Sequence, residues 1–329
     1  MTPREAAFHS VLADGIARFL THKRALGRRF QSEERELRLL DRFLHTHAVA
    51  RLEDLTADLL AAFLASRPRR WPRSYNHLLG VVRGLLDWLV GQGILPASPL
   101  RATPRRVTTQ RLPYLFDAAL ARRLLAIASS LEDAAGAPLR GLTYRTMFAL
   151  LYGLGLRVGE VARLQRADVD LARAVLCIRA TKFGKSRLVP FGPRMAALLR
   201  DYLDRAAEKR GALPPEAPVF SFRRRRAVHP GTISQTFHHL LPRLALTLPA
   251  GTAPPRVHTL RHSFAVGTLL RWYRAGIAPA DRLLQLSTFL GHVNPTSTAV
   301  YLTITADLLQ EASRRFERLA APTLPEAGS

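Results

Sequence analysis

Six side chains beyond residue 156 have the types and the order needed to break a phosphodiester bond. They are Arg157, Lys182, His258, Arg261, His292 and Tyr301. Arginine and histidine can bind phosphate oxygens, lysine can protonate a leaving oxygen, and a phenol can serve as the nucleophile. The set therefore predicts phosphodiester chemistry that needs no metal ion and no other cofactor.

Arg157 stands where a glycine turn meets a new helix. Gly155 is expected to end one helix and Arg157 to open the next, where free backbone N–H groups also attract phosphate. Glu160 follows one turn later. We expect it to orient Arg157, and the alternative is an ordinary surface ion pair.

His258 and Arg261 are three residues apart and should share one face of a helix, from which Arg261 can bind a second phosphate oxygen. His258 and His262 also have zinc-ligand spacing, but Thr259 stands where such helices carry a glutamate. We therefore expect His262 to be a packed structural histidine.

His292 comes directly after Gly291, and Tyr301 is expected on the next short helix. A single tyrosine is usually a half-buried core residue, but beside a phosphate held by two arginines it becomes a credible nucleophile. Residues 184–186 resemble the end of a phosphate-binding loop. However, Arg179 stands where that pattern requires glycine, which argues against a nucleotide cofactor.

The charge of the chain points to a polyanionic partner. Among 329 residues, 49 Lys and Arg oppose 25 Asp and Glu, which gives a formal net charge of +24. Such an excess repels itself unless a polyanion neutralises it, and nucleic acid is the polyanion that fits best. A membrane surface fits less well, because the basic residues are not confined to one amphipathic helix.

The sequence also predicts a compartment. The longest apolar run, residues 147–156, is about half the length that spans a bilayer. The N-terminal residues lack an apolar signal core, and Cys177 is the single cysteine, expected as a small buried hydrophobe. We therefore expect a cytoplasmic protein that associates with the nucleoid.

Residues 1–100 are predicted to form a small domain of four or five helices, because leucines recur there at helical spacing. Thr56 is the expected N-cap of one helix, and Trp71 and Trp88 are expected in the core. Prolines and basic residues without periodicity predict a linker at residues 101–113.

A second domain is expected at residues 114–321, followed by a disordered tail at 322–329. Its helices are predicted at residues 117–129, 140–153, 158–164, 193–208, 231–245, 259–275, 280–290 and 306–319. β-rich runs at 174–180 and 187–191 predict a hairpin with Lys182 and Lys185 at its tip. The fold class is therefore mainly α with a small β-sheet.

This second domain resembles the catalytic domain of the tyrosine recombinases, the phage integrase and Xer-like family. The matching motifs are Gly155-Leu156-Arg157-x-x-Glu160, Thr181-Lys182-x-Gly184-Lys185, His258-x-x-Arg261-His262, Leu290-Gly291-His292 and Tyr301. Residues 1–100 resemble the family's helical core-binding domain, which binds DNA. The resemblance implies a helical DNA-binding domain followed by a mixed α/β catalytic domain.

The resemblance also implies a mechanism. Tyr301 would attack a DNA phosphate, giving a 3′-phosphotyrosyl enzyme and a free 5′-hydroxyl. Arg157 and Arg261 would stabilise the pentavalent phosphate. His258 would help to deprotonate the tyrosine, and His292 would bind the phosphate.

Lys182 would protonate the departing 5′-oxygen, with Lys185 as its rival for this role. Lysine suits it because it can release a proton, whereas arginine cannot. Glu160, Lys185 and His262 are expected to support the six catalytic residues.

DNA contacts are expected at two polar, basic stretches. They comprise Arg69, Arg70, Arg73, Ser74 and Asn76 at the start of the last N-terminal helix, and Arg223, Arg224, Arg225, Arg226, Ser234 and Gln235 further on. The alternative for an arginine run is a solvated face, but a helix start is a good position for entering a DNA groove.

The family resemblance implies a tetramer on synapsed double-stranded DNA, with or without other recombinases. The segment 306–319, with Leu308, Leu309, Ala312 and Phe316 on one stripe, would be the helix traded between protomers. The alternative is that this helix packs on its own domain.

Two other functions stand beside strand exchange. One is a type IB-like topoisomerase, against which the helical first domain and the segment after Tyr301 argue. The other is a catalytically silent DNA-binding accessory protein, which would have no reason to keep both Tyr301 and Lys182. Residues 286–289 resemble transposon-borne members and suggest a mobile element.

Overall fold

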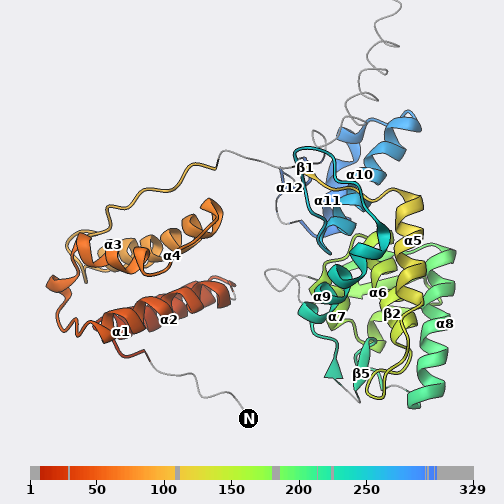
Figure 1. The fold of residues 1–329 in the computed structure, drawn as a ribbon, viewed down its shortest axis with the longest axis horizontal. Helices are drawn as coiled ribbons and strands as arrows, with labels where there is room; N and C mark the ends of the chain where they lie inside the picture. The colour runs from red at the N-terminus through yellow and green to blue at the C-terminus, as the bar shows by residue number, and fades with distance from the viewer. Residues whose placement is uncertain are drawn as a thin grey trace, which may run out of the picture. The chain divides into compact units, whose positions relative to one another are not determined.

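The computed structural model describes residues 8–28, 30–107, 112–179, 186–212, 214–223, 226–292, 294, 296–299 and 301. The chain divides into two compact units, residues 1–110 and 111–329 (Figure 1). The predicted helix at 306–319, the tail at 322–329 and the predicted hairpin tip with Lys182 and Lys185 lie outside the described residues.

Helices make up the described part of the first unit. They are α1 (Ala13–Ala25), α2 (Gln31–Thr46), η1 (Leu52–Asp54), α3 (Ala57–Ala65) and α4 (Pro72–Gly91). Their apolar faces enclose one core, in which Leu37 and Leu85 are fully buried. Thr56 caps α3 as predicted, because its hydroxyl accepts a hydrogen bond from the backbone N–H of Leu59 at 3.2 Å.

The prediction that Trp71 belongs to the core is wrong. Trp71 is 60% exposed, and the Arg70 guanidinium lies 5.3 Å from the centroid of its ring. It precedes Pro72, the first residue of α4, and so stands outside the apolar stripe of that helix. Trp88 does pack against the core, with its ring 5.7 Å from that of Phe19.

The start of the predicted linker packs on the first unit. Arg83 Nη2 donates to the carbonyl of Ala102 at 2.7 Å. The Asn76 amide exchanges two hydrogen bonds with the backbone of Arg105, at 2.8 and 2.7 Å. These bonds fix the path of the chain as it leaves α4.

The second unit is mainly helical. Its elements include α5 (Ala118–Ser129), α6 (Arg140–Gly153), α7 (Val158–Arg163), η2 (Arg166–Asp168), α8 (Pro193–Arg210), α9 (Pro230–Leu240), η4 (Leu241–Leu244), α10 (Thr259–Arg274), α11 (Pro279–Leu290) and α12 (Thr296–Ala299). The longest apolar run of the sequence includes the second half of α6, which packs against α5, α8 and α10 (Figure 1). The helix predicted at 231–245 ends at Leu240 instead and continues as η4, because Pro242 lacks the N–H that a continued α-helix needs.

Short strands complete this unit. β2 (Val169–Asp170), β3 (Val175–Ile178) and β4 (Arg187–Pro190) form an antiparallel sheet in which Ile178 lies opposite Arg187. Two further pairs are β1 (Leu112–Pro113) with β7 (Thr252–Ala253), and β5 (Ser221–Arg223) with β6 (Arg226–Ala227). The mainly helical class with small sheets is confirmed. Cys177, on β3, is half-buried instead of buried.

Candidate active site

Arg157 occupies the N-cap of α7 and is tied to Glu160. Its Nη1 donates to Glu160 Oε1 at 2.8 Å, and its backbone N–H donates to Glu160 Oε2 at 2.9 Å. The Glu160 side chain is only 2% exposed, whereas that of Arg157 is 32% exposed. The pair is therefore a buried carboxylate that orients a partly open guanidinium, and the surface ion pair does not fit.

Gly155 allows Arg157 and Arg261 to approach the same point. Its φ is +60°, and a Cβ there would lie 2.5 Å from Cδ1 of Phe264. Both the backbone conformation and the space therefore require glycine. The carbonyl of Gly155 accepts a hydrogen bond from Nη1 of Arg261 at 2.6 Å, and Arg261 is only 1% exposed.

Three arginines meet at the C-terminus of α11. Arg187 Nε donates to Phe289 O at 2.8 Å, Arg261 Nη2 to Leu290 O at 2.7 Å, and Arg157 Nη2 to Gly291 O at 2.9 Å. Carbonyls at a helix C-terminus carry partial negative charge and lack partners within the helix, so cations stabilise them. The guanidinium groups thereby fix the point at which the chain leaves α11 toward His292.

Arg187, which no sequence motif singled out, is the second charged partner of Glu160. Its Nη1 and Nη2 donate to Glu160 Oε1 and Oε2, each at 2.9 Å, and its side chain is 9% exposed. The one available signal was an arginine at the start of a strand directly after the lysine-bearing turn.

Tyr301 is buried and bonded to His262. A hydrogen bond of 2.9 Å joins the Tyr301 hydroxyl to Nδ1 of His262, and Tyr301 is 4% exposed. His262 was expected to be a structural histidine, yet it is the residue that holds the phenol. The ring of His258 lies 4.6 Å from that of His262, centroid to centroid.

His292 lies beside Tyr301. The two rings are stacked with centroids 6.3 Å apart, and Nδ1 of His292 forms a 2.7 Å hydrogen bond with the Thr298 hydroxyl. The structure therefore brings Arg157, Arg261, His258, His292 and Tyr301 together around the end of α11.

Burial and charge set the protonation states of the site. Burial raises the pKa of Glu160, but hydrogen bonds and charge from Arg187 and Arg157 outweigh it and bring the pKa to about 2. Desolvation and neighbouring positive charges lower the pKa of His258 and of His292 to about 4 each. Burial raises the pKa of Tyr301, which Arg261 and Arg157 partly offset. Near neutral pH the two imidazoles are uncharged and the phenol is protonated.

The residues predicted to contact DNA differ in their bonding partners and in their exposure. The Asn76 amide is bonded to Arg105, and Arg69 pairs with Glu36 at 2.7 Å. The exposed members of the predicted DNA-contact set are Arg70, Arg73, Ser74, Arg226 and Gln235. The Ser234 hydroxyl donates to the carbonyl of Pro230 at 3.0 Å. Arg224, Arg225 and the side chain of Arg223 lie outside the described residues.

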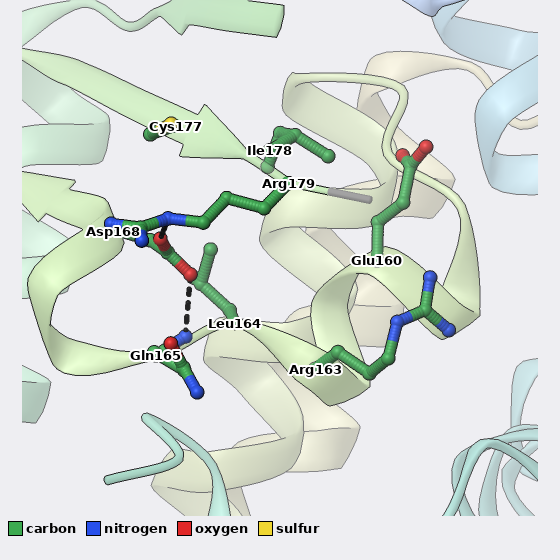
Figure 2. Close-up of a pocket in the computed structure, with 8 residues that line it drawn as sticks. All are labelled: Glu160, Arg163, Leu164, Gln165, Asp168, Cys177, Ile178 and Arg179. Atoms are coloured by element: carbon green, nitrogen blue, oxygen red, sulfur yellow. Dashed lines mark hydrogen bonds and ion pairs between the residues drawn. The ribbon is translucent and has the colours of Figure 1, made fainter. Parts of the chain in front are cut away.

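A small cavity of about 180 Å³ adjoins the site at Glu160. Its lining is Glu160, Arg163, Leu164, Gln165, Asp168, Cys177, Ile178 and Arg179. Figure 2 shows Glu160 at one side and the ion pair of Asp168 with Arg179 at the other. Of the five predicted catalytic residues that the structure describes, none lines this cavity, so it is separate from the place where those five meet.

No described helix is long and apolar enough to cross a membrane. The same part of the chain contains no cluster of three or more His, Cys, Asp or Glu that could hold a metal ion.

Residues 120–307 match the model of the phage integrase family, and the chain belongs to that family. It is a site-specific tyrosine recombinase of the integrase type.

Named relatives span nearly the whole chain. The putative integrase/recombinase y4rB of Sinorhizobium fredii is 35% identical over 94% of this chain and 98% of its own length. Tyrosine recombinase XerD of Ralstonia nicotianae is 29% identical over 91% of this chain and 88% of its own. A lambda integrase tetramer bound to a Holliday junction shares the fold, with a TM-score of 0.59 at 20% identity, over 87% of this chain and 78% of that one.

Proposed function

We propose that this recombinase cuts DNA with Tyr301 as the nucleophile, forming a 3′-phosphotyrosyl bond and releasing a 5′-hydroxyl. The observation that carries the proposal is the meeting of Arg157, Arg261, His292 and Tyr301 around residues 289–291. The ester keeps the energy of the broken bond, so a 5′-hydroxyl of another strand can attack it and rejoin the DNA without ATP.

Arg157 and Arg261 bind the non-bridging oxygens in this mechanism. Negative charge grows on these oxygens in the pentavalent transition state, and two fixed guanidinium groups stabilise it where other nucleases use metal ions. His292 donates a further hydrogen bond to the phosphate. The arginines also donate to backbone carbonyls, so a phosphate must compete for those donors.

Proton transfer falls to neutral histidine and to lysine. His258, with its pKa lowered to about 4, is uncharged near neutral pH and can accept the proton of Tyr301. His262 bonds the hydroxyl of Tyr301 and lies in contact with the ring of His258, so it stands between the two. Lys182 protonates the leaving 5′-oxygen, and Lys185 is its rival for that step.

The proposed assembly is a tetramer on synapsed double-stranded DNA of the nucleoid. The solved lambda integrase is a tetramer bound to a Holliday junction, which supports this arrangement. Residues 1–100 would bind DNA as a core-binding domain, 101–113 would link it to the catalytic domain at 114–321, and helix 306–319 would pass between protomers. The exposed Arg70, Arg73 and Arg226 are the candidates for phosphate contacts.

The test is the substitution Tyr301→Phe, compared with Tyr273→Phe in the same apolar cluster. With nicked duplexes that tile the DNA on either side of the gene, Tyr301→Phe should form no SDS-resistant adduct yet bind DNA like the wild type. Tyr273→Phe should keep both properties. Adduct formation by Tyr301→Phe would refute the assignment, and a general loss of DNA binding would favour a structural role.

A further inference from the structure

We propose that Arg187 is a positioning residue for the strand-cleavage step. It would hold Glu160, and through Glu160 the guanidinium of Arg157, in the orientation that receives the scissile phosphate. This inference rests on the proposed function, in which Arg157 binds that phosphate.

The contacts of Arg187 commit its guanidinium to the protein interior. Nη1 and Nη2 bond the two oxygens of Glu160 at 2.9 Å each, and Nε bonds the carbonyl of Phe289 at 2.8 Å. Its Nε, Nη1 and Nη2 all have partners within the protein, and two of these partners are oxygens of a charged carboxylate, so we do not assign Arg187 as a phosphate ligand. A planar fork matches a carboxylate in a way that the single ammonium group of lysine cannot.

Glu160 would compete with DNA for Arg157 if Arg187 were absent. Its Oε1 accepts from Nη1 of Arg157 and also from Nη1 of Arg187. Without Arg187, the guanidinium of Arg157 would be the one described cation that hydrogen-bonds this buried carboxylate, and it would be drawn inward. Arg187 therefore leaves the guanidinium of Arg157, the more exposed of the two arginines, available to bind the scissile phosphate.

Arg187 also touches the chain segment that leads to His292. Gly291 has φ +68°, and a Cβ there would lie 2.7 Å from Nη1 of Arg187. The backbone therefore passes directly against the guanidinium. A rival role for Arg187 is to support the segment that includes Lys182. Arg187 pairs with Ile178 at the base of the hairpin that this segment connects.

The variants Arg187→Met and Arg187→Lys test the proposal in single-turnover cleavage of nicked duplexes that tile the DNA flanking the gene. At saturating DNA, the adduct-forming rate of Arg187→Met should fall roughly 10- to 100-fold, because a catalytic guanidinium is misplaced. Its DNA affinity should change by less than about threefold, since the contact of Arg157 is only one of the several phosphate contacts that hold the DNA. Arg187→Lys should fall between Arg187→Met and the wild type. Arg205→Met, which removes an exposed arginine of α8, should match the wild type.

A substrate with a 5′-phosphorothiolate leaving group separates the two roles, because that group leaves without a proton. The defect of Arg187→Met should persist with it. Rescue to the wild-type rate would overturn the proposal and assign Arg187 to the lysine segment. An undiminished rate in either variant would also overturn it.

Circular dichroism and thermal unfolding establish that each variant is folded. If Arg187→Met does not fold, the cleavage rate and DNA affinity of Arg187→Lys are compared with those of the wild type instead. A wild-type chain without any adduct would overturn the proposed function, and this inference with it. A wild-type adduct together with full activity in Arg187→Met would overturn the inference alone.

Discussion

Glu160 is a buried carboxylate whose charge is kept by two arginines. Its pKa is lowered to about 2, because the bonds to Arg187 and Arg157 outweigh the cost of burial. A carboxyl with a lowered folded-state pKa stabilises the fold above its unfolded-state pKa, and the stabilisation is lost as the pH falls toward the folded-state value.

Glu160→Gln should therefore lower the free energy of unfolding near pH 7 by on the order of 3 kcal/mol. The difference from the wild type should shrink as the pH falls from 5 to 3, because Glu160 of the unfolded wild type binds a proton in this range while the folded carboxylate, with a pKa of about 2, stays ionised. Urea unfolding of both proteins across this pH range measures the difference in unfolding free energy. Glu216→Gln, at an exposed site, should change stability by less than about 0.5 kcal/mol at every pH. A constant difference between wild type and Glu160→Gln would contradict the role given to the charge.

At the scale of elements, the end of α11 is the feature that assembles the site. Its last carbonyls accept hydrogen bonds from Arg187, Arg261 and Arg157, and Gly291 ends the helix in the left-handed conformation. One glycine thus both reverses the chain and leaves room for Arg187.

Two glycine substitutions separate these effects. Gly291→Ala and Gly276→Ala both place a Cβ at positive φ, +68° and +75°. Each should cost about 1 kcal/mol of unfolding free energy from backbone strain. Only Gly291→Ala should also lower the cleavage rate, since its Cβ meets Arg187, whereas no described atom lies within 4 Å of a Cβ at Gly276. Equal cleavage rates in the two variants would refute the coupling through Arg187.

The sequence predicted elements whose signals are local. The bounds of α6 are those expected, Arg140–Gly153, and the strands β3 and β4 lie within the runs expected for the hairpin. Arg187 escaped prediction because its partners, Glu160 and the carbonyl of Phe289, are 27 and 102 residues away. The bond between His262 and Tyr301 spans 39 residues and depends on the packing of α10 against the segment after α11. Periodicity and motif spacing carry no information on such tertiary contacts.

At the scale of the whole molecule, the net charge of +24 should make DNA binding strongly dependent on salt. For a contact to several phosphates, affinity should fall roughly a thousandfold between 50 and 200 mM salt, because bound cations are released from the DNA. Fluorescence anisotropy with Tyr301→Phe measures binding without covalent capture. A shallow salt dependence would contradict a phosphate-dominated interface.

The proposed mechanism depends on a phosphotyrosyl bond that forms at Tyr301 without metal. The most direct measurement is to incubate the wild-type chain with nicked cognate duplex in EDTA, isolate the SDS-resistant adduct and identify the modified peptide by mass spectrometry. DNA should be attached to the peptide that contains Tyr301, in undiminished yield in EDTA. An adduct on another residue, or one that requires a divalent cation, would contradict it.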